Sequence, residues 1–199
     1  MIVGFDFDNT IISYEKLFKK IAYKKRLVPK NIKSNKNSIK EYLISKKKEK
    51  EWTILQGEVY GRYIMDAKIY IGVKKALKLL SRNKIKFYII SHKTKFPILG
   101  KKTNLHVAAI KWINKNLLKK NKFINLSIKE IYFEKSIEKK ISRIKKLKCD
   151  IYVDDLKKIL DLLPKRVLKI LFSPNDKNYN LKSIITMKNW IDFSKIIKN

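Results

Sequence analysis

Two aspartates near the start of the sequence are spaced for acid–base and metal chemistry. Asp6 and Asp8 belong to the segment FDFDNT at residues 5–10, which follows an apolar run that begins at Ile2. The run is too short for a helix and is typical of a buried parallel strand. An aspartate after such a strand often only caps a helix or forms a turn, so the chemistry depends on which other residues join it.

Polar side chains stand at corresponding places further along the sequence. The second predicted strand ends at Ser91-His92-Lys93, and the fourth ends at Asp154-Asp155. Lys140 lies one turn into the helix that follows the third strand. Ligands of an open parallel sheet bind at the carboxyl ends of its strands, so these groups are expected to converge on one crevice.

The residue types are chemically consistent with one another. Carboxylates that meet in a cleft repel each other unless a cation lies among them, and hard oxygen ligands suit Mg²⁺. A serine hydroxyl and a lysine ammonium beside that metal are ligands for phosphate. The sequence therefore predicts a site for magnesium and a phosphoryl group.

Strands that alternate with helical segments predict a parallel sheet covered on both faces. The predicted fold class is α/β, a Rossmann-like three-layer α/β/α core with a five-stranded, mostly parallel sheet. Residues 14–68 contain helical patterns and no strand, which predicts an all-helical insertion after the first strand; residues 1–13 and 69–199 form the predicted core. The predicted strands are 2–6, 86–91, 130–133, 151–153 and 167–172, and the predicted core helices are 73–81, 103–118, 136–147, 156–163 and 187–197.

The motifs together resemble those of the haloacid-dehalogenase-type phosphatases. Asp-x-Asp-x-Thr at residues 6–10 looks like the first motif of that family, Ser91 like the second, and Asp154-Asp155 like the fourth. Lys140 resembles the third motif, with Lys139 as a rival. The family often has proline after this lysine, whereas Ile141 follows here, which leaves the choice of lysine open.

The resemblance implies a mechanism. Asp6 would attack phosphorus to form an aspartyl-phosphate, and Asp8 would protonate the leaving oxygen and then activate water. Mg²⁺ would be held by Asp6, the backbone carbonyl of Asp8 and Asp154, with Asp155 assisting. The phosphate-binding residues that the resemblance implies are Thr10, Ser91 and Lys140, and His92 is added as a phosphate contact because it lies next to Ser91.

The acid at position 8 favours a hydrolase, because the family's dehalogenases lack it and its ion pumps carry threonine there. The insertion 14–68 sits where the family places its small helical C1 cap, which closes over the substrate. The expected substrate is a small phosphorylated metabolite, such as a sugar phosphate or a nucleotide. Gln56, Tyr60 and Arg62 are the predicted substrate contacts in the cap.

The formal charge of +32 supports other interpretations. It favours a phosphatase that acts on nucleic-acid ends, or a catalytically idle, basic nucleic-acid-binding protein of the same fold. Only five of the 49 basic residues are arginine, the usual residue for bidentate phosphate contacts, and isoleucine and asparagine are also abundant. A/T-rich codons would inflate lysine, isoleucine and asparagine together, so the charge is interpreted mainly as genome bias.

The sequence contains no apolar run near the ~20 residues that a membrane span requires. No secretory signal is visible, and Cys149 is the single cysteine, so no internal disulfide can form. We therefore predict a cytoplasmic protein without membrane partners, in which Cys149 is a packing thiol.

Overall fold

A computed structural model of the chain describes residues 1–119, 123–174 and 183–197. The chain folds into two compact units, each made of stretches that are separate in sequence. The first unit contains Met1–Ile12, Ile69–Lys93 and Lys115–Asn199, and the second contains Ser13–Lys68 and Thr94–Asn114.

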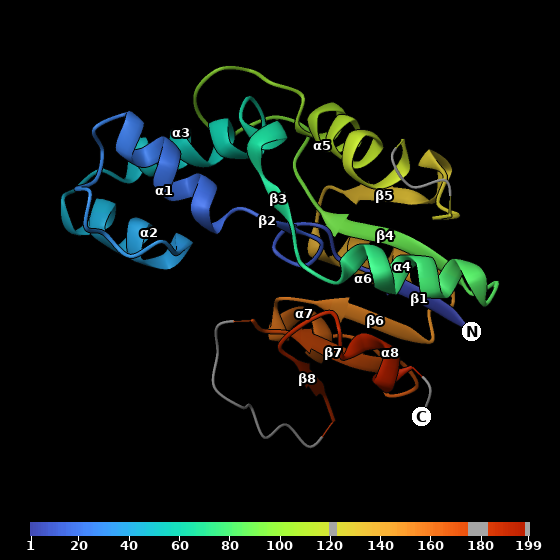
Figure 1. Cartoon of the computed structure of the whole chain (residues 1–199). Helices are drawn as coiled ribbons and strands as arrows, with labels where there is room; N and C mark the ends of the chain where they lie inside the picture. The colour runs from blue at the N-terminus through green and yellow to red at the C-terminus, as the bar shows by residue number, and fades with distance from the viewer. Residues whose placement is uncertain (120–122, 175–182, 198–199) are drawn as a thin grey trace. The chain divides into compact units, whose positions relative to one another are not determined.

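A six-stranded sheet forms the centre of the first unit (Figure 1), in the order β5-β4-β1-β6-β7-β8. Every neighbouring pair in this order is parallel. The predicted parallel α/β sheet is therefore confirmed, with six strands in place of five. The strands are β1 (Ile2–Phe5), β4 (Lys86–His92), β5 (Ile131–Glu134), β6 (Ile151–Asp154), β7 (Leu168–Phe172) and β8 (Ile185–Met187).

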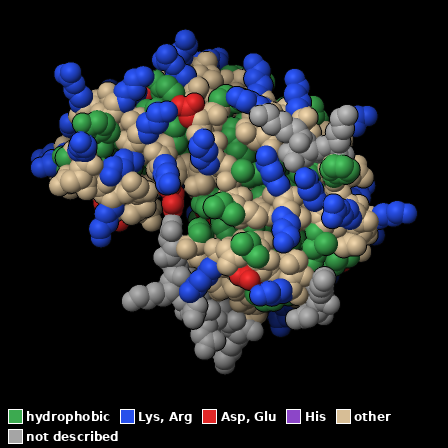
Figure 2. Space-filling view, viewed as in Figure 1, with side chains coloured by type: hydrophobic (Ala, Val, Ile, Leu, Met, Phe, Trp, Pro, Cys, Tyr) green, Lys and Arg blue, Asp and Glu red, His purple; other side chains and the backbone are tan. Residues whose placement is uncertain are grey.

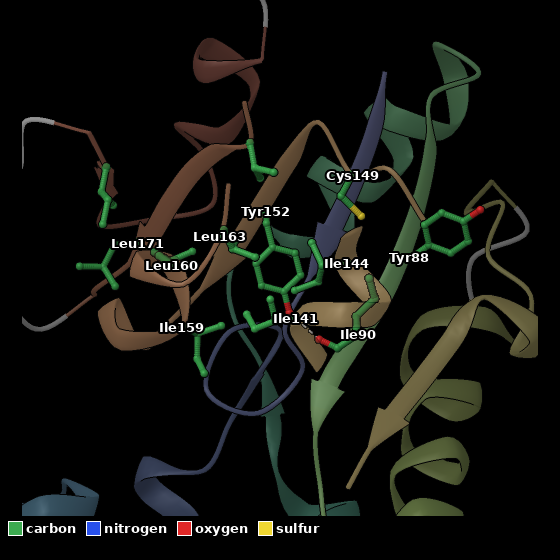
Figure 3. Close-up of a cluster of buried hydrophobic side chains, with 12 residues drawn as sticks. Tyr88, Ile90, Ile141, Ile144, Cys149, Tyr152, Ile159, Leu160, Leu163 and Leu171 are labelled. Carbon is green, nitrogen blue, oxygen red and sulfur yellow. Dashed lines mark hydrogen bonds between the residues drawn. The ribbon is translucent and has the colours of Figure 1, made fainter. Parts of the chain in front are cut away.

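Helices cover both faces of this sheet because alternate strand residues point to opposite sides. On one face, α6 (Ile137–Lys146) and α7 (Lys157–Asp161) pack on a buried apolar cluster (Figure 3). On the other face lie α4 (Val73–Arg82) and α8 (Phe193–Ile196), and the Phe193 ring centroid is 5.6 Å from that of Phe5. The first unit is thus a three-layer α/β/α sandwich, as predicted.

Tyr152 ties β6 to β4 across the intervening strand. Its hydroxyl donates a hydrogen bond of 2.5 Å to the carbonyl of Ile90 (Figure 3). The side chain crosses β1 at Gly4, where an added Cβ would lie 2.6 Å from Tyr152 Cδ2. Only glycine allows this approach, so Gly4 permits the three central strands to be locked together.

The C-terminal part differs from the prediction of one helix over 187–197. Ile185–Met187 forms β8 beside β7, and the helix α8 is confined to Phe193–Ile196. A turn separates them, in which Asn189 Oδ1 accepts hydrogen bonds from the backbone N–H groups of Ile191 and Asp192. An asparagine that bonds the backbone two and three residues on favours a turn over a helix.

The second unit is helical. The Phe18 and Trp52 rings stack with centroids 5.4 Å apart, which joins α1 (Glu15–Lys24) to α3 (Glu49–Tyr60). Two short strands, β2 (Ile12–Ser13) and β3 (Lys68–Ile69), form a separate two-stranded sheet, of which Ser13 and Lys68 belong to this unit and Ile12 and Ile69 to the first. The helices of the unit are α1 (Glu15–Lys24), α2 (Lys36–Ser45), α3 (Glu49–Tyr60), α5 (Leu105–Ile113) and the 3₁₀ turn η1 (Ile64–Asp66).

Residues 94–114 pack with these helices. An added Cβ at Gly57 of α3 would lie 2.6 Å from Cβ of Pro97, so the two segments are in close contact there. Trp112 Nε1 donates a 3.0 Å hydrogen bond to the carbonyl of Ala67. The second unit is therefore larger than the predicted insertion 14–68, which lacks residues 94–114.

Two short helical turns complete the described part of the first unit: η2 (Asn114–Leu118), a π turn that begins on the last residue of the second unit, and η3 (Ile128–Glu130), a 3₁₀ turn. Across residues 1–119, 123–174 and 183–197, no helix combines the length and the apolar character needed to cross a bilayer.

Cys149 is buried, in agreement with a packing role. Burial raises the pKa of its thiol to about 12, and only the thiolate is nucleophilic. We expect Cys149 to resist alkylation by iodoacetamide at pH 8 in the folded protein and to react fully in denaturant. Mass spectrometry of the native and denatured protein measures this, and rapid labelling of the native thiol would contradict it.

Candidate active site

The three central strands bring the predicted residues to one edge of the sheet. Asp6 directly follows β1, Ser91 lies near the end of β4, and Asp154 ends β6. The order β4-β1-β6 makes these strands neighbours, and their parallel pairing places their carboxyl ends together.

Four buried side chains are linked directly at this edge. Lys140 Nζ lies 2.6 Å from Asp6 Oδ1 and 2.6 Å from Asp154 Oδ2. Ser91 Oγ donates a 2.9 Å hydrogen bond to Asp6 Oδ1. A hydroxyl and an ammonium therefore already lie against the carboxylate that the sequence predicts to be the nucleophile.

Helix α6 explains why Lys140, and not Lys139, lies in this cluster. Ser136 caps the helix by accepting a hydrogen bond from the backbone N–H of Lys139. The apolar stripe through Ile141 and Ile144 then turns Lys140 inward, where it is 2% exposed, while Lys139 is exposed. Burial alone would lower the pKa of Lys140, but Asp6, Tyr152 and Asp154 outweigh it and raise that pKa well above its ordinary value.

Three carboxylates of the cluster could hold a metal ion. One oxygen from each of Asp6, Asp154 and Asp155 lies within 4.8 Å of the other two. Burial, reinforced by the neighbouring carboxylates, raises the pKa of Asp6 to about 7 and that of Asp155 well above its ordinary value. Burial also raises the pKa of Asp154. All the donor atoms are oxygen, and the raised pKa values mean that nearby positive charge does not fully balance the three carboxylates. The residues therefore fit a hard divalent cation such as Mg²⁺.

A tight turn after β1 places Asp8 beside the cluster. The backbone N–H groups of Ile11 and Ile12 both donate to the carbonyl of Phe7, and Asn9 takes a left-handed φ of 58°. Asparagine tolerates this conformation better than most residues, so the sequence suits the turn. The Asp8 side chain is 20% exposed, in contrast to the buried Asp6.

Lys93, at the end of the second predicted strand, is a further residue of the site. Its ammonium lies 2.6 and 2.9 Å from the two carboxylate oxygens of Asp8, and its side chain is 3% exposed. A signal was present in the sequence, because alternate residues of an extended segment share a side and Lys93 stands two residues after Ser91.

The remaining predicted residues lie in different settings. Thr10 is buried, and no hydrogen-bond partner for its Oγ1 is found within the described part of the chain. His92, beside Ser91, is exposed. In the second unit, the Tyr60 ring packs on Tyr14 with centroids 4.8 Å apart. Gln56 is half-buried there, and Arg62 is exposed, with its guanidinium over the Tyr63 ring.

Similarity to known proteins is found in the three-dimensional structure. No protein-family model and no curated protein sequence matches the chain. A hydrolase of the haloacid-dehalogenase superfamily, family IA variant 3, from Entamoeba histolytica superposes with a TM-score of 0.60 at 17% identity, over 100% of this chain and 99% of that one. A subfamily IA variant 1 hydrolase from Geobacter sulfurreducens gives a TM-score of 0.59 at 9% identity, over 98% and 95% of the two chains.

A further similar structure is a haloacid-dehalogenase-type phosphatase from Thermococcus onnurineus, with a TM-score of 0.56 at 15% identity, over 98% of this chain and 97% of that one. These matches extend over nearly the whole length of both chains, helical unit included. The parallel sheet order, the strand-end cluster and the full-length superpositions agree: the chain has the fold of the haloacid-dehalogenase-type hydrolases.

Proposed function

We propose that the protein is a Mg²⁺-dependent phosphomonoester hydrolase that acts through an aspartyl-phosphate on Asp6. The observation that carries the proposal is the contact of Lys140 with both Asp6 and Asp154, together with the Ser91 hydrogen bond to Asp6. The hydroxyl of Ser91 and the ammonium of Lys140 therefore both bind Oδ1 of Asp6, the proposed nucleophile. The similar structures include a phosphatase, which is consistent with this activity.

Each residue has a chemical task in the proposed reaction. An Asp6 oxygen forms a bond to phosphorus while the bond from phosphorus to the leaving oxygen breaks, and Asp8 gives that oxygen a proton. Asp8 then takes a proton from the water that attacks phosphorus, which releases Asp6 and inorganic phosphate. Lys140 and Ser91 bind the phosphoryl oxygens and stabilise their developing charge.

The groups proposed to hold Mg²⁺ are the carboxylates of Asp6, Asp154 and Asp155 and the backbone carbonyl of Asp8. The bound ion neutralises charge on the phosphoryl oxygens. The proposed phosphate contacts of Thr10 and His92 stay predictions, as do the substrate contacts of Gln56, Tyr60 and Arg62. The insertion of the helical unit directly after the Asp8 turn supports a cap function for it, and a cap suits a small phosphorylated metabolite.

Removal of divalent metal tests the core of the proposal. We expect hydrolysis of p-nitrophenyl phosphate in Mg²⁺ to fall at least about 100-fold in EDTA and to return when Mg²⁺ is added in excess, because the carboxylate cluster then regains its counter-charge. Release of p-nitrophenol, followed by absorbance, measures this. Turnover that EDTA leaves unchanged would contradict a metal-dependent site.

Because the net charge is +32, nucleic-acid ends are a second candidate substrate class. Figure 2 shows that the basic side chains of the visible face are spread over it and do not gather into one track. A panel of sugar phosphates, nucleotides and 3′- or 5′-phosphorylated oligonucleotides separates the two classes. Preferred turnover of the oligonucleotides, with a steep loss of rate at higher salt, would support nucleic-acid ends.

A further inference from the structure

Lys93 is a buried lysine whose ammonium lies on the more exposed of the two catalytic carboxylates. The side chain of Lys93 is 3% exposed and that of Asp8 is 20% exposed. Both Asp8 oxygens are within 2.9 Å of the ammonium. Burying a lysine is costly unless it is paired, so a buried lysine in contact with both oxygens indicates a maintained interaction.

The backbone holds Lys93 in place beyond the end of β4. Its N–H donates a 2.9 Å hydrogen bond to the carbonyl of Glu134, which extends the pairing of β4 with β5 by one residue. Its ammonium also lies 5.8 Å from the centroid of the Phe7 ring, in the turn that carries Asp8. The lysine is therefore fixed to the sheet, whereas Asp8 belongs to a turn.

The two buried lysines of the site serve different carboxylates. Lys140 forms ion pairs with Asp6, the proposed nucleophile, and with Asp154, a proposed metal ligand. Lys93 lies on Asp8, which the proposed function assigns to proton transfer. A carboxylate bonded through both oxygens to a fixed ammonium cannot turn toward solvent without breaking both contacts.

We propose that Lys93 is the positioning residue for Asp8: it holds the general acid–base carboxylate in line with the leaving oxygen and later with the attacking water. The inference rests on the proposed function and deepens it. One Asp8 oxygen gives its proton to the leaving group and afterwards takes one from water, while the other oxygen stays on the ammonium.

The dependence of rate on the leaving group tests this role. p-Nitrophenolate leaves without help from an acid, whereas the more basic phenolate of phenyl phosphate needs a proton. We expect Lys93→Met to lower kcat/KM for phenyl phosphate by about 10- to 100-fold and for p-nitrophenyl phosphate by about threefold or less. The ratio kcat/KM is used because it reports the step in which the leaving group departs.

Three further measurements separate positioning from other roles. The Ki of inorganic phosphate is expected to stay within about twofold in Lys93→Met, and Lys93→Arg should recover part of the lost rate. In an Asp8→Asn background, Lys93→Met should change kcat/KM by less than about twofold, since a residue that acts only through Asp8 has nothing left to position. Lys95→Met, at an exposed lysine two residues further on, serves as the matched control and should match the wild type.

Opposite results would overturn the proposal. An equal loss for both esters, a Ki for phosphate that rises with the loss of rate, or a full additional loss in the Asp8→Asn background would show that Lys93 maintains the fold or binds the phosphoryl group. Failure of the proposed function is recognised separately: the wild type would then not hydrolyse p-nitrophenyl phosphate, or Asp6→Asn would be as active as the wild type.

Discussion

Replacing Asp6 with asparagine is expected to lower the rate of p-nitrophenyl phosphate hydrolysis at least about 1,000-fold, because an amide oxygen cannot take the place of the attacking carboxylate. The substitution keeps the shape of the side chain, so Ser91 and Lys140 retain a neighbour of the same size. Burial raises the pKa of Asp6 to about 7, which means that the folded protein disfavours its charged form. The variant should therefore stay folded, and the loss should appear in kcat.

The matched control for this variant is Asp161→Asn on α7, where the aspartate is exposed and pairs with Lys157. It should hydrolyse the substrate at the wild-type rate. Circular dichroism during heating shows whether both variants are folded. Asp6→Asn with more than a tenth of wild-type activity would exclude Asp6 as the nucleophile.

Replacing Lys140 with methionine is expected to have the largest effect on stability. The variant keeps most of the side-chain volume but leaves Asp6 and Asp154 buried without their shared cation. Removal of one partner of a buried ion pair costs about 3–5 kcal/mol in the free energy of unfolding. Urea denaturation without metal measures this loss, and Mg²⁺ should recover part of it, because an ion bound only by the folded state stabilises that state.

Lys139→Met is the control, since Lys139 is exposed on the same helix turn. Its free energy of unfolding should stay within about 0.5 kcal/mol of the wild type. The double variant Lys140→Met with Asp154→Asn should be more stable than Lys140→Met alone, because one uncompensated charge is gone. Equal stabilities of wild type and Lys140→Met would contradict the ion-pair arrangement.

The strands and most of the cluster could be predicted because their signals are local. A short apolar run followed by an acid marks both β1 with Asp6 and β6 with Asp154. Lys140 lies three residues from Ile137 and four from Ile144, so helical spacing places it beside the buried stripe and favours it over Lys139, and Lys140 is buried in the structure. Each of these inferences needs only a few neighbouring residues.

The features that were missed depend on distant contacts. β8 is a strand because it pairs with β7 at the edge of the sheet. The segment Ile185–Met187 is too short for its own sequence pattern to predict a strand. Residues 94–114 join the helical unit through Gly57 with Pro97 and Trp112 with Ala67, pairs that are separated by 40 and 45 residues. Lys93 is one of many lysines, and its place two residues after Ser91 does not by itself predict the contact with Asp8.

The central position of β1 in the sheet has a consequence for folding. Asp6 meets Ser91 across 85 residues of sequence and Lys140 across 134. Contacts of such high contact order require large loops to close, which slows folding and makes these contacts form late. During synthesis, Asp6 emerges long before its partners, so the carboxylate cluster has no local precursor. The site therefore forms only after β1, β4, β6 and α6 have come together.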